Sequence, residues 1–106
     1  MKIEIKQGDT RHAIRAAFKT VDGNQVDLST ASVLFKMAHR GGTTVLNREA
    51  TVEPDGRVRF VFTEGETNTP GLFKGEFLVT YADTRVETFP HQGSIDIYIE
   101  SRIGGI

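Results

Sequence analysis

The sequence predicts an all-β domain, and three observations carry that prediction. Apolar and polar residues alternate in short segments, as they do in a strand that buries one face. Turn-forming residues recur about every 8–12 positions, and glycine occupies 11 of the 106 positions. The resulting count of about eight or nine short strands favours a sandwich or barrel over βαβ units.

The clearest strand lies in the segment from Gly71 to Pro90, which organises the rest of the chain. Alternate positions in this segment are apolar, so one strand face can bury a continuous row. The members of that row are Phe73, Phe77, Val79 and Tyr81, with Gly75 between them. None of these side chains is chemically reactive. The row therefore predicts a central strand and indicates no chemistry.

A tight turn and a return strand follow this central strand. If Asp83 and Thr84 are the two loop residues, Tyr81 faces Val86. The same register places Thr88 opposite Val79, so that the apolar rows of both strands join. Thr84 stands where glycine would suit a two-residue loop, and a wider loop is the alternative.

The first half of the chain contains one ambiguous segment. Residues 2–6 alternate isoleucine with charged residues and predict a short first strand. Residues 11–18 have good helix propensity, but they also alternate and precede an Asp22-Gly23 turn signal. We interpret them as a strand that enters a hairpin, with a helix as the alternative.

Further strands are expected at residues 33–37, 45–52, 58–62 and 95–99. Pro54-Asp55-Gly56 separates two of them, because proline presets φ and glycine accepts a positive φ. One helical turn is an option for residues 64–67.

The apolar faces of these segments define one expected core. Its members are Ile14, Phe18, Val33, Phe35, Val58, Phe60, Phe62, Phe73, Phe77, Val79, Tyr81, Ile95, Ile97 and Ile99. We expect a single sandwich domain over residues 1–100 and a short tail over residues 101–106.

The composition excludes several classes of function. The chain has no cysteine, which removes disulfide frameworks, cysteine nucleophiles and thiolate metal sites. Its 13 basic and 14 acidic residues give a net charge of −1, which argues against a broad surface for nucleic acid or anionic membranes. No apolar run approaches the roughly 20 residues that a membrane span needs.

Two sets of polar residues are candidates for a metal site or for catalysis. His12, His39 and His91 lack the paired spacing of metal ligands, so we interpret them as solvated loop imidazoles. A metal site built in space is the alternative. Asp22, Asp55 and Asp83 lie in turns, where carboxylates cap backbone amides, and nothing pairs them for catalysis. We therefore expect no enzyme, no cofactor, no catalytic residue and no metal ligand.

Four arginines lie near two phenylalanines, a combination that also occurs in single-strand nucleic-acid sites. They are Arg40, Arg48, Arg57 and Arg59, close to Phe60 and Phe62. The phenylalanines match a core face and the arginines take the opposite one. The preferred interpretation is a solvated strand face, with no nucleic-acid partner.

Five turn segments follow one another in a specific order. They are Lys6-Gln7-Gly8-Asp9-Thr10, Asp22-Gly23-Asn24 with Val26-Asp27-Leu28, Ala31-Ser32-Val33, Thr67-Asn68-Thr69-Pro70-Gly71, and the run from Thr80 to Pro90. In this order they resemble the N-terminal domain of bacteriophage baseplate upper proteins. The resemblance extends over about residues 6–100.

The resemblance implies a single immunoglobulin-like antiparallel β-sandwich of about eight short strands. It implies a non-catalytic structural module of a phage or prophage tail, located in the virion after assembly in the cytoplasm of the host bacterium. The implied partners are other tail or baseplate proteins, and a homo-oligomer is left open. No membrane partner is expected.

Two hypotheses for the contact surface accompany this expectation. Isoleucines near both ends, Ile3, Ile5, Ile103 and Ile106, are candidate partner-docking residues, with frayed ends as the alternative. The alternative function is a carbohydrate- or host-receptor-binding sandwich that uses Tyr98, His91 and the loop of residues 39–44. The absence of tryptophan and an aromatic content of 8% weigh against sugar binding.

Overall fold

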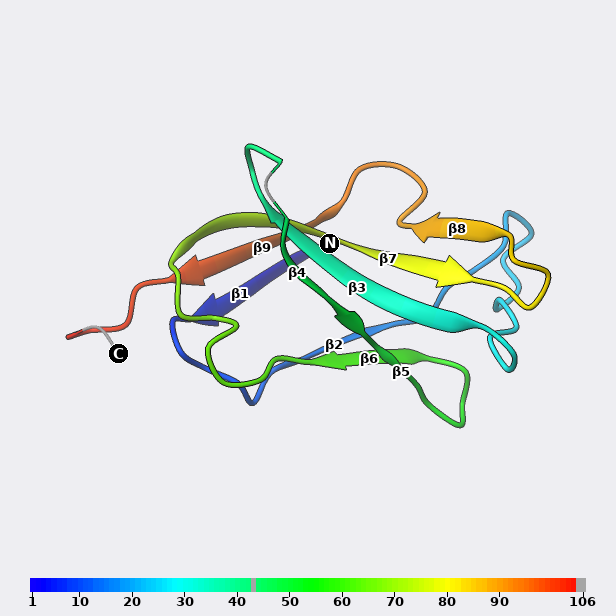
Figure 1. The fold of residues 1–106 in the computed structure, drawn as a ribbon, viewed down its shortest axis with the longest axis horizontal. Helices are drawn as coiled ribbons and strands as arrows, with labels where there is room; N and C mark the ends of the chain where they lie inside the picture. The colour runs from blue at the N-terminus through cyan, green and yellow to red at the C-terminus, as the bar shows by residue number, and fades with distance from the viewer. Residues whose placement is uncertain (43, 105–106) are drawn as a thin grey trace.

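The structure, a computed structural model, describes residues 1–42 and 44–104. Nine strands and no helix occur in this part of the chain (Figure 1). The strands are β1 (Lys2–Lys6), β2 (Ala13–Ala16), β3 (Ser32–His39), β4 (Thr44–Glu49), β5 (Thr51–Val52), β6 (Val58–Val61), β7 (Gly71–Thr80), β8 (Val86–Phe89) and β9 (Ile95–Glu100).

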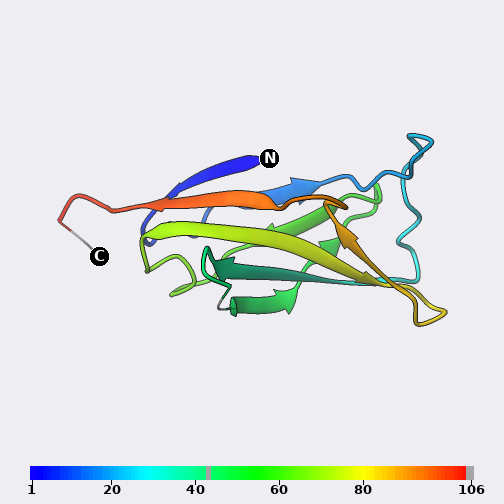
Figure 2. The same cartoon turned by 90° about the horizontal axis from the view of Figure 1, so that it is seen from above.

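The strands form two stacked sheets, which confirms the β-sandwich. Sheet A has the order β1-β9-β7-β3-β4, with β8 also paired to β7, and sheet B has the order β2-β6-β5. Figure 1 shows sheet A above sheet B, and Figure 2 shows the strands of sheet A side by side. β8 and β9 pair with successive halves of β7, so they act as one interrupted strand.

One pairing departs from the expected antiparallel arrangement. β1 runs parallel to β9, with Ile3 opposite Ile97 and Ile5 opposite Ile99. The arrows of both strands point the same way in Figure 1. The chain leaves β1 through a turn toward sheet B instead of folding back beside it, so the parallel orientation is available at this edge.

The strand expected at residues 45–52 is split between the sheets. β4 pairs with β3 in sheet A, whereas β5 pairs with β6 in sheet B. Ala50 stands between them, and its N–H donates to the carbonyl of Val33 at 2.9 Å. The chain therefore changes sheets at Ala50.

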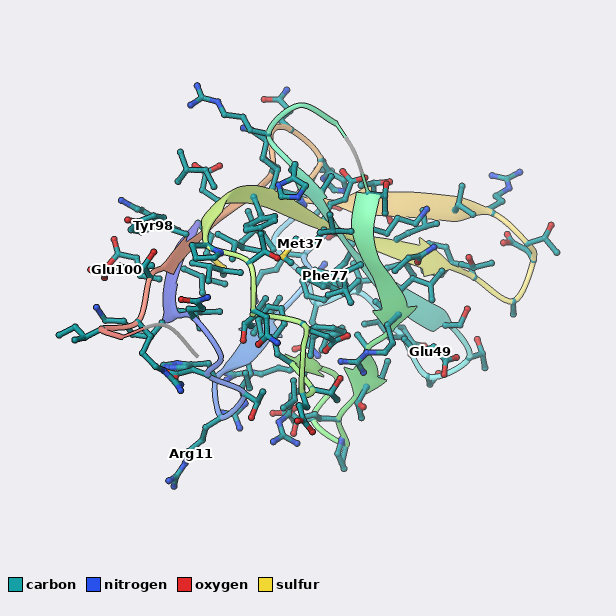
Figure 3. All side chains as sticks on the ribbon, turned by 60° about the vertical axis from the view of Figure 1, so that its left-hand side comes forward. Arg11, Met37, Glu49, Phe77, Tyr98 and Glu100 are labelled. Atoms are coloured by element: carbon teal, nitrogen blue, oxygen red, sulfur yellow. The ribbon has the colours of Figure 1, made fainter. Side chains whose placement is uncertain are left out.

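The core lies between the sheets and consists largely of the expected residues. All of them are buried except Tyr81, which is half-buried, and Ile5, Leu28, Met37 and Phe89 join them. Phe35 links the sheets: its ring centroid lies 4.5 Å from that of Phe60 and 5.1 Å from that of Phe77. Figure 3 shows Phe77 and Met37 inside the molecule.

The hairpin between β7 and β8 corrects the expected register. The Tyr81 N–H donates to the carbonyl of Arg85 at 2.8 Å, so the loop comprises the residues 82–84 between them. Thr84 adopts a positive φ of 71° to close this wider loop. Val79 therefore lies opposite Glu87, and Val86 is 62% exposed instead of facing the core. The prediction of a two-residue loop was wrong, and its alternative is confirmed.

Two smaller questions are also settled. The ambiguous residues 11–18 contain β2 and lead into a hairpin turn, where Val26 N–H donates to the Phe18 carbonyl at 2.8 Å. Residues 64–67 form hydrogen-bonded turns and no helix. Thr67 is fully buried there, and its hydroxyl donates to the Asp9 carbonyl at 2.9 Å, which ties this loop to the turn after β1.

Candidate docking surface

The outer face of sheet A carries an apolar pair, in which Leu72 is exposed and Tyr98 is half-buried. Leu72 on β7 lies opposite Tyr98 on β9, and Leu72 is 52% exposed. Both side chains point outward because their neighbours Phe73 and Ile97 face the core. Figure 3 shows Tyr98 at the periphery of the molecule, in contrast to the interior Phe77.

The pair lies in a groove of about 330 Å³, here called the Tyr98 groove. Its lining consists of Lys2, Arg40, Leu72, Phe73, Lys74, Asp96, Ile97 and Tyr98. Strand alternation on β1, β7 and β9 supplies most of the side chains, and the loop after β3 adds Arg40. Segments far apart in sequence thus meet at one site.

The Tyr98 groove has an excess of positive charge. It contains three cations, Lys2, Arg40 and Lys74, against one acid, Asp96. Lys74 Nζ lies 3.7 Å from Asp96 Oδ1, whereas Arg40 forms no ion pair with any residue that the structure describes. An apolar floor with cations at its border suits a partner that presents an apolar group beside carboxylates.

A second hollow of about 430 Å³ adjoins the Tyr98 groove on the same face and shares Lys74 with it. Lys36, Glu76, Ala38 and Ser94 line it, and the last two are small residues. The hollow extends the contact surface across β7 toward β3.

The four terminal isoleucines occupy very different positions. Ile5 is 3% exposed and belongs to the core, so it offers no surface for docking in this fold. Ile3 is half-buried and packs against the core. Ile103 is 99% exposed on the segment that leads away from β9 (Figures 1 and 2). Ile106 lies outside the described residues.

The three histidines are not brought together. His39 lies over the Phe73 ring at a centroid distance of 4.6 Å, His12 is exposed near Asp9, and His91 contacts Glu87. Within residues 1–42 and 44–104, no group of three or more His, Cys, Asp or Glu side chains could hold a metal ion. His91 and Tyr98 also line different hollows. Of the residues proposed for carbohydrate binding, Tyr98 and Arg40 line the same groove.

The arginines correct a second expectation. Arg48 lies opposite Phe35 and therefore points inward, where its guanidinium lies 4.4 Å from the Phe60 ring centroid. Its Nη2 donates to Glu66 Oε1 at 2.8 Å, and Glu66 is half-buried in this ion pair. The hydrogen bond to Glu66 raises the pKa of Arg48. Burial raises the pKa of Glu66, but hydrogen bonds from Arg48 and Thr63 outweigh burial and lower it.

A polar cluster that the sequence did not reveal lies beside β8. Tyr81 Oη donates to Glu87 Oε1 at 2.6 Å, and His91 Nε2 lies 2.7 Å from Glu87 Oε2. Burial and the neighbouring Glu87 carboxylate raise the pKa of Tyr81 to about 12, and the Tyr81 hydroxyl lowers the pKa of Glu87. The sequence did not reveal this cluster because the expected register of β8 placed Glu87 on the outer face. In the structure β8 is shifted by one residue, and Glu87 lies opposite Val79 on the inner face.

Two of the turn aspartates accept hydrogen bonds from backbone N–H groups of their turns, as the sequence predicts. Asp55 Oδ1 accepts from the Arg57 N–H and Asp83 Oδ1 accepts from the Arg85 N–H, each at 3.0 Å. Asp27 caps Ser29 in the same way, which lowers the pKa of Asp27. These carboxylates stabilise turns.

The two stacked sheets, with no helix among the described residues, define the chain as an all-β sandwich. The crystal structure of CopC from Methylosinus trichosporium OB3b is similar to it, with a TM-score of 0.56 at 14% identity. The similarity covers 95% of this chain and 85% of that one, and at this identity it supports the fold alone. No protein-family model matches the chain, and no curated protein matches its sequence.

No helix among the described residues is long and apolar enough to cross a membrane.

Proposed function

We propose that this chain is a non-catalytic structural module of a phage or prophage tail, and that it acts by docking onto another tail or baseplate protein. The ordered turn segments that resemble baseplate upper proteins support the setting. The observation that carries the docking role is the outward-facing Leu72–Tyr98 pair in a groove that three cations also line.

The composition of the groove indicates the chemistry of the partner. Leu72 and Tyr98 offer apolar contact area, and aromatic residues are enriched at protein interfaces. Lys2, Arg40 and Lys74 surround them, so a complementary surface presents an apolar side chain flanked by carboxylates. Such charge pairs fix the register of docking more than they add affinity.

Co-elution tests this proposal. The purified chain is mixed with proteins encoded beside it in its genome and separated by size-exclusion chromatography. We expect a complex with one tail protein, which Leu72→Glu removes by placing a charge in the contact.

Val86→Glu is the matched control, since Val86 is 62% exposed on the same sheet at the far end of β7. A Leu72→Glu chain that still co-elutes would exclude the groove. Failure of the unmodified chain to bind any tail protein would contradict the tail setting.

A second candidate function is binding of a carbohydrate or host receptor. The specific observation in its favour is that Tyr98 and Arg40 line the same groove. An aromatic ring beside cations suits a sugar that bears an acidic group. A glycan array tests it: we expect binding that Tyr98→Ala abolishes, and an array without signal removes this candidate.

A further inference from the structure

The outer face of sheet B places two arginines directly opposite each other. Arg15 on β2 lies opposite Arg59 on β6, and Thr51 on β5 lies on the other side of Arg59 in the same row. Both arginines are exposed. Like charges at directly opposite positions of a sheet are destabilising. The contact between these two like charges therefore does not stabilise the fold.

The neighbouring carboxylates compensate this pair only weakly. Arg15 Nε lies 3.9 Å from Glu53 Oε1, and Arg59 forms no ion pair within the part of the chain that the structure describes. Arg57 shares the outward parity of Arg59, because Val58 between them is fully buried. Its Nε lies 3.8 Å from Asp55 Oδ2. The three arginines form a basic strip along sheet B.

We propose that the Arg15–Arg59 pair binds an acidic segment of a partner protein. Two adjacent guanidinium groups offer planar donor forks that match carboxylates, and an incoming carboxylate removes the repulsion between them. Sheet B packs on the inner face of sheet A (Figure 1), so the outer face of sheet B points away from the outer face of sheet A, which carries the Tyr98 groove. The domain then has two docking faces and links two proteins, which goes beyond the docking role proposed above.

Protein carboxylates fit this strip better than nucleic acid does. A single-strand site needs exposed aromatic rings for base stacking. The nearby rings of Phe60 and Phe62 are each 1% exposed, and the outward neighbours of the arginines are Ala13 and Val61. The net charge of −1 also gives no broad attraction for a polyanion.

Fluorescence anisotropy tests the proposal with a labelled glutamate-rich peptide and, in a separate arm, a labelled single-stranded oligonucleotide, both at low ionic strength. We expect the peptide to bind, with affinity that falls as salt rises. The double variant Arg15→Gln/Arg59→Gln should weaken peptide binding about tenfold or more. The matched control is Lys19→Gln/Arg85→Gln, which removes the same charge from exposed sites outside the arginine pair and the Tyr98 groove and should change peptide binding less than about twofold.

A stability measurement separates binding from a structural role. Arg59→Gln alone removes the like-charge pair and should raise the thermal midpoint by about 1–5 °C. A lower midpoint would indicate that Arg59 supports the fold. The proposal is overturned if the unmodified chain does not bind the peptide or if both double variants lose binding equally. It is also overturned if the oligonucleotide binds more tightly than the peptide through the same arginines.

Discussion

Arg48 and Glu66 join the two sheets of the sandwich through a two-pronged ion pair. Arg48 Nε donates to Glu66 Oε2 at 3.0 Å and its Nη2 to Glu66 Oε1 at 2.8 Å. The same Nη2 donates to the Val61 carbonyl on β6 at 2.7 Å, and Glu66 also accepts from the Thr63 N–H. One arginine on an edge strand of sheet A thereby holds the loop that leaves sheet B.

Replacing Glu66 with alanine should destabilise the fold by about 1–3 kcal/mol, because the Arg48 guanidinium and the Thr63 N–H lose their acceptor. Urea unfolding provides the measurement. Glu4→Ala is the control. Glu4 pairs with Lys2 on the surface, so its replacement should lower the free energy of unfolding by less than about 1 kcal/mol. Equal effects of the two substitutions would show that the Arg48–Glu66 pair is no stronger than a surface pair.

The contribution of Glu66 should depend on pH in a defined direction. Its pKa is lowered from the ordinary value of 4.5 in the folded protein, so the folded state favours the carboxylate. The stabilisation is complete above pH 4.5 and is lost as the pH falls through the lower folded-state pKa. The difference in unfolding free energy between the unmodified chain and Glu66→Gln should therefore shrink in acid. A difference that stays constant from neutral pH to below pH 4 would contradict the lowered pKa.

Gly75 on β7 should tolerate no side chain. A Cβ at this position would lie 2.8 Å from Phe35 Cζ and 2.9 Å from Ile97 Cδ1, both inside the core. Gly75→Ala should cost about 1–3 kcal/mol through overpacking, measured by thermal or urea unfolding. Gly41→Ala is the control, since no described residue beyond its chain neighbours has an atom within 4 Å of its Cβ position. A neutral Gly75→Ala would mean that Phe35 and Ile97 can move aside.

Thr84 should be replaceable by glycine with a gain in stability. Its positive φ of 71° is unfavourable for a β-branched residue and natural for glycine. The relief of strain, less the entropy that glycine loses on folding, should stabilise the domain by about 0.5–1 kcal/mol. Thr84→Ala retains the unfavourable φ and should give a clearly smaller gain. An equal gain from alanine would show that φ is not the cause.

The segment after β9 should divide into an anchored part and a docking part. Arg102 donates to Asp9 Oδ1 at 2.8 Å and to Gln7 Oε1 at 3.2 Å, whereas Ile103 contributes no buried surface. Deleting residues 103–106 should leave the thermal midpoint unchanged and weaken co-elution with a tail protein. Deleting residues 101–106 should also lower the midpoint. Co-elution that survives the shorter deletion would restrict docking to the sheet faces.

Strand alternation allowed much of the fold to be predicted from the sequence. Residues 71–80 and 95–99 place apolar side chains at every second position, and strand geometry sends those side chains to one face. The outward positions of Leu72 and Tyr98 follow from the same rule. The sequence nevertheless gave no reason to single out this pair, because the two residues belong to different strands whose register was unknown.

The sequence by itself determined the all-β class, the core phenylalanines other than Phe89, and the parity of each strong strand, because these depend on neighbours along one strand. Tertiary structure decided the features that need contacts between distant segments. The parallel pairing with β9 buries Ile5, the positive φ at Thr84 shifts β8 by one residue, and the approach of two sheets turns Arg48 inward to Glu66. The Arg15–Arg59 pair belongs to the same group. Local alternation specifies a face, whereas register and sheet order specify which residues share it.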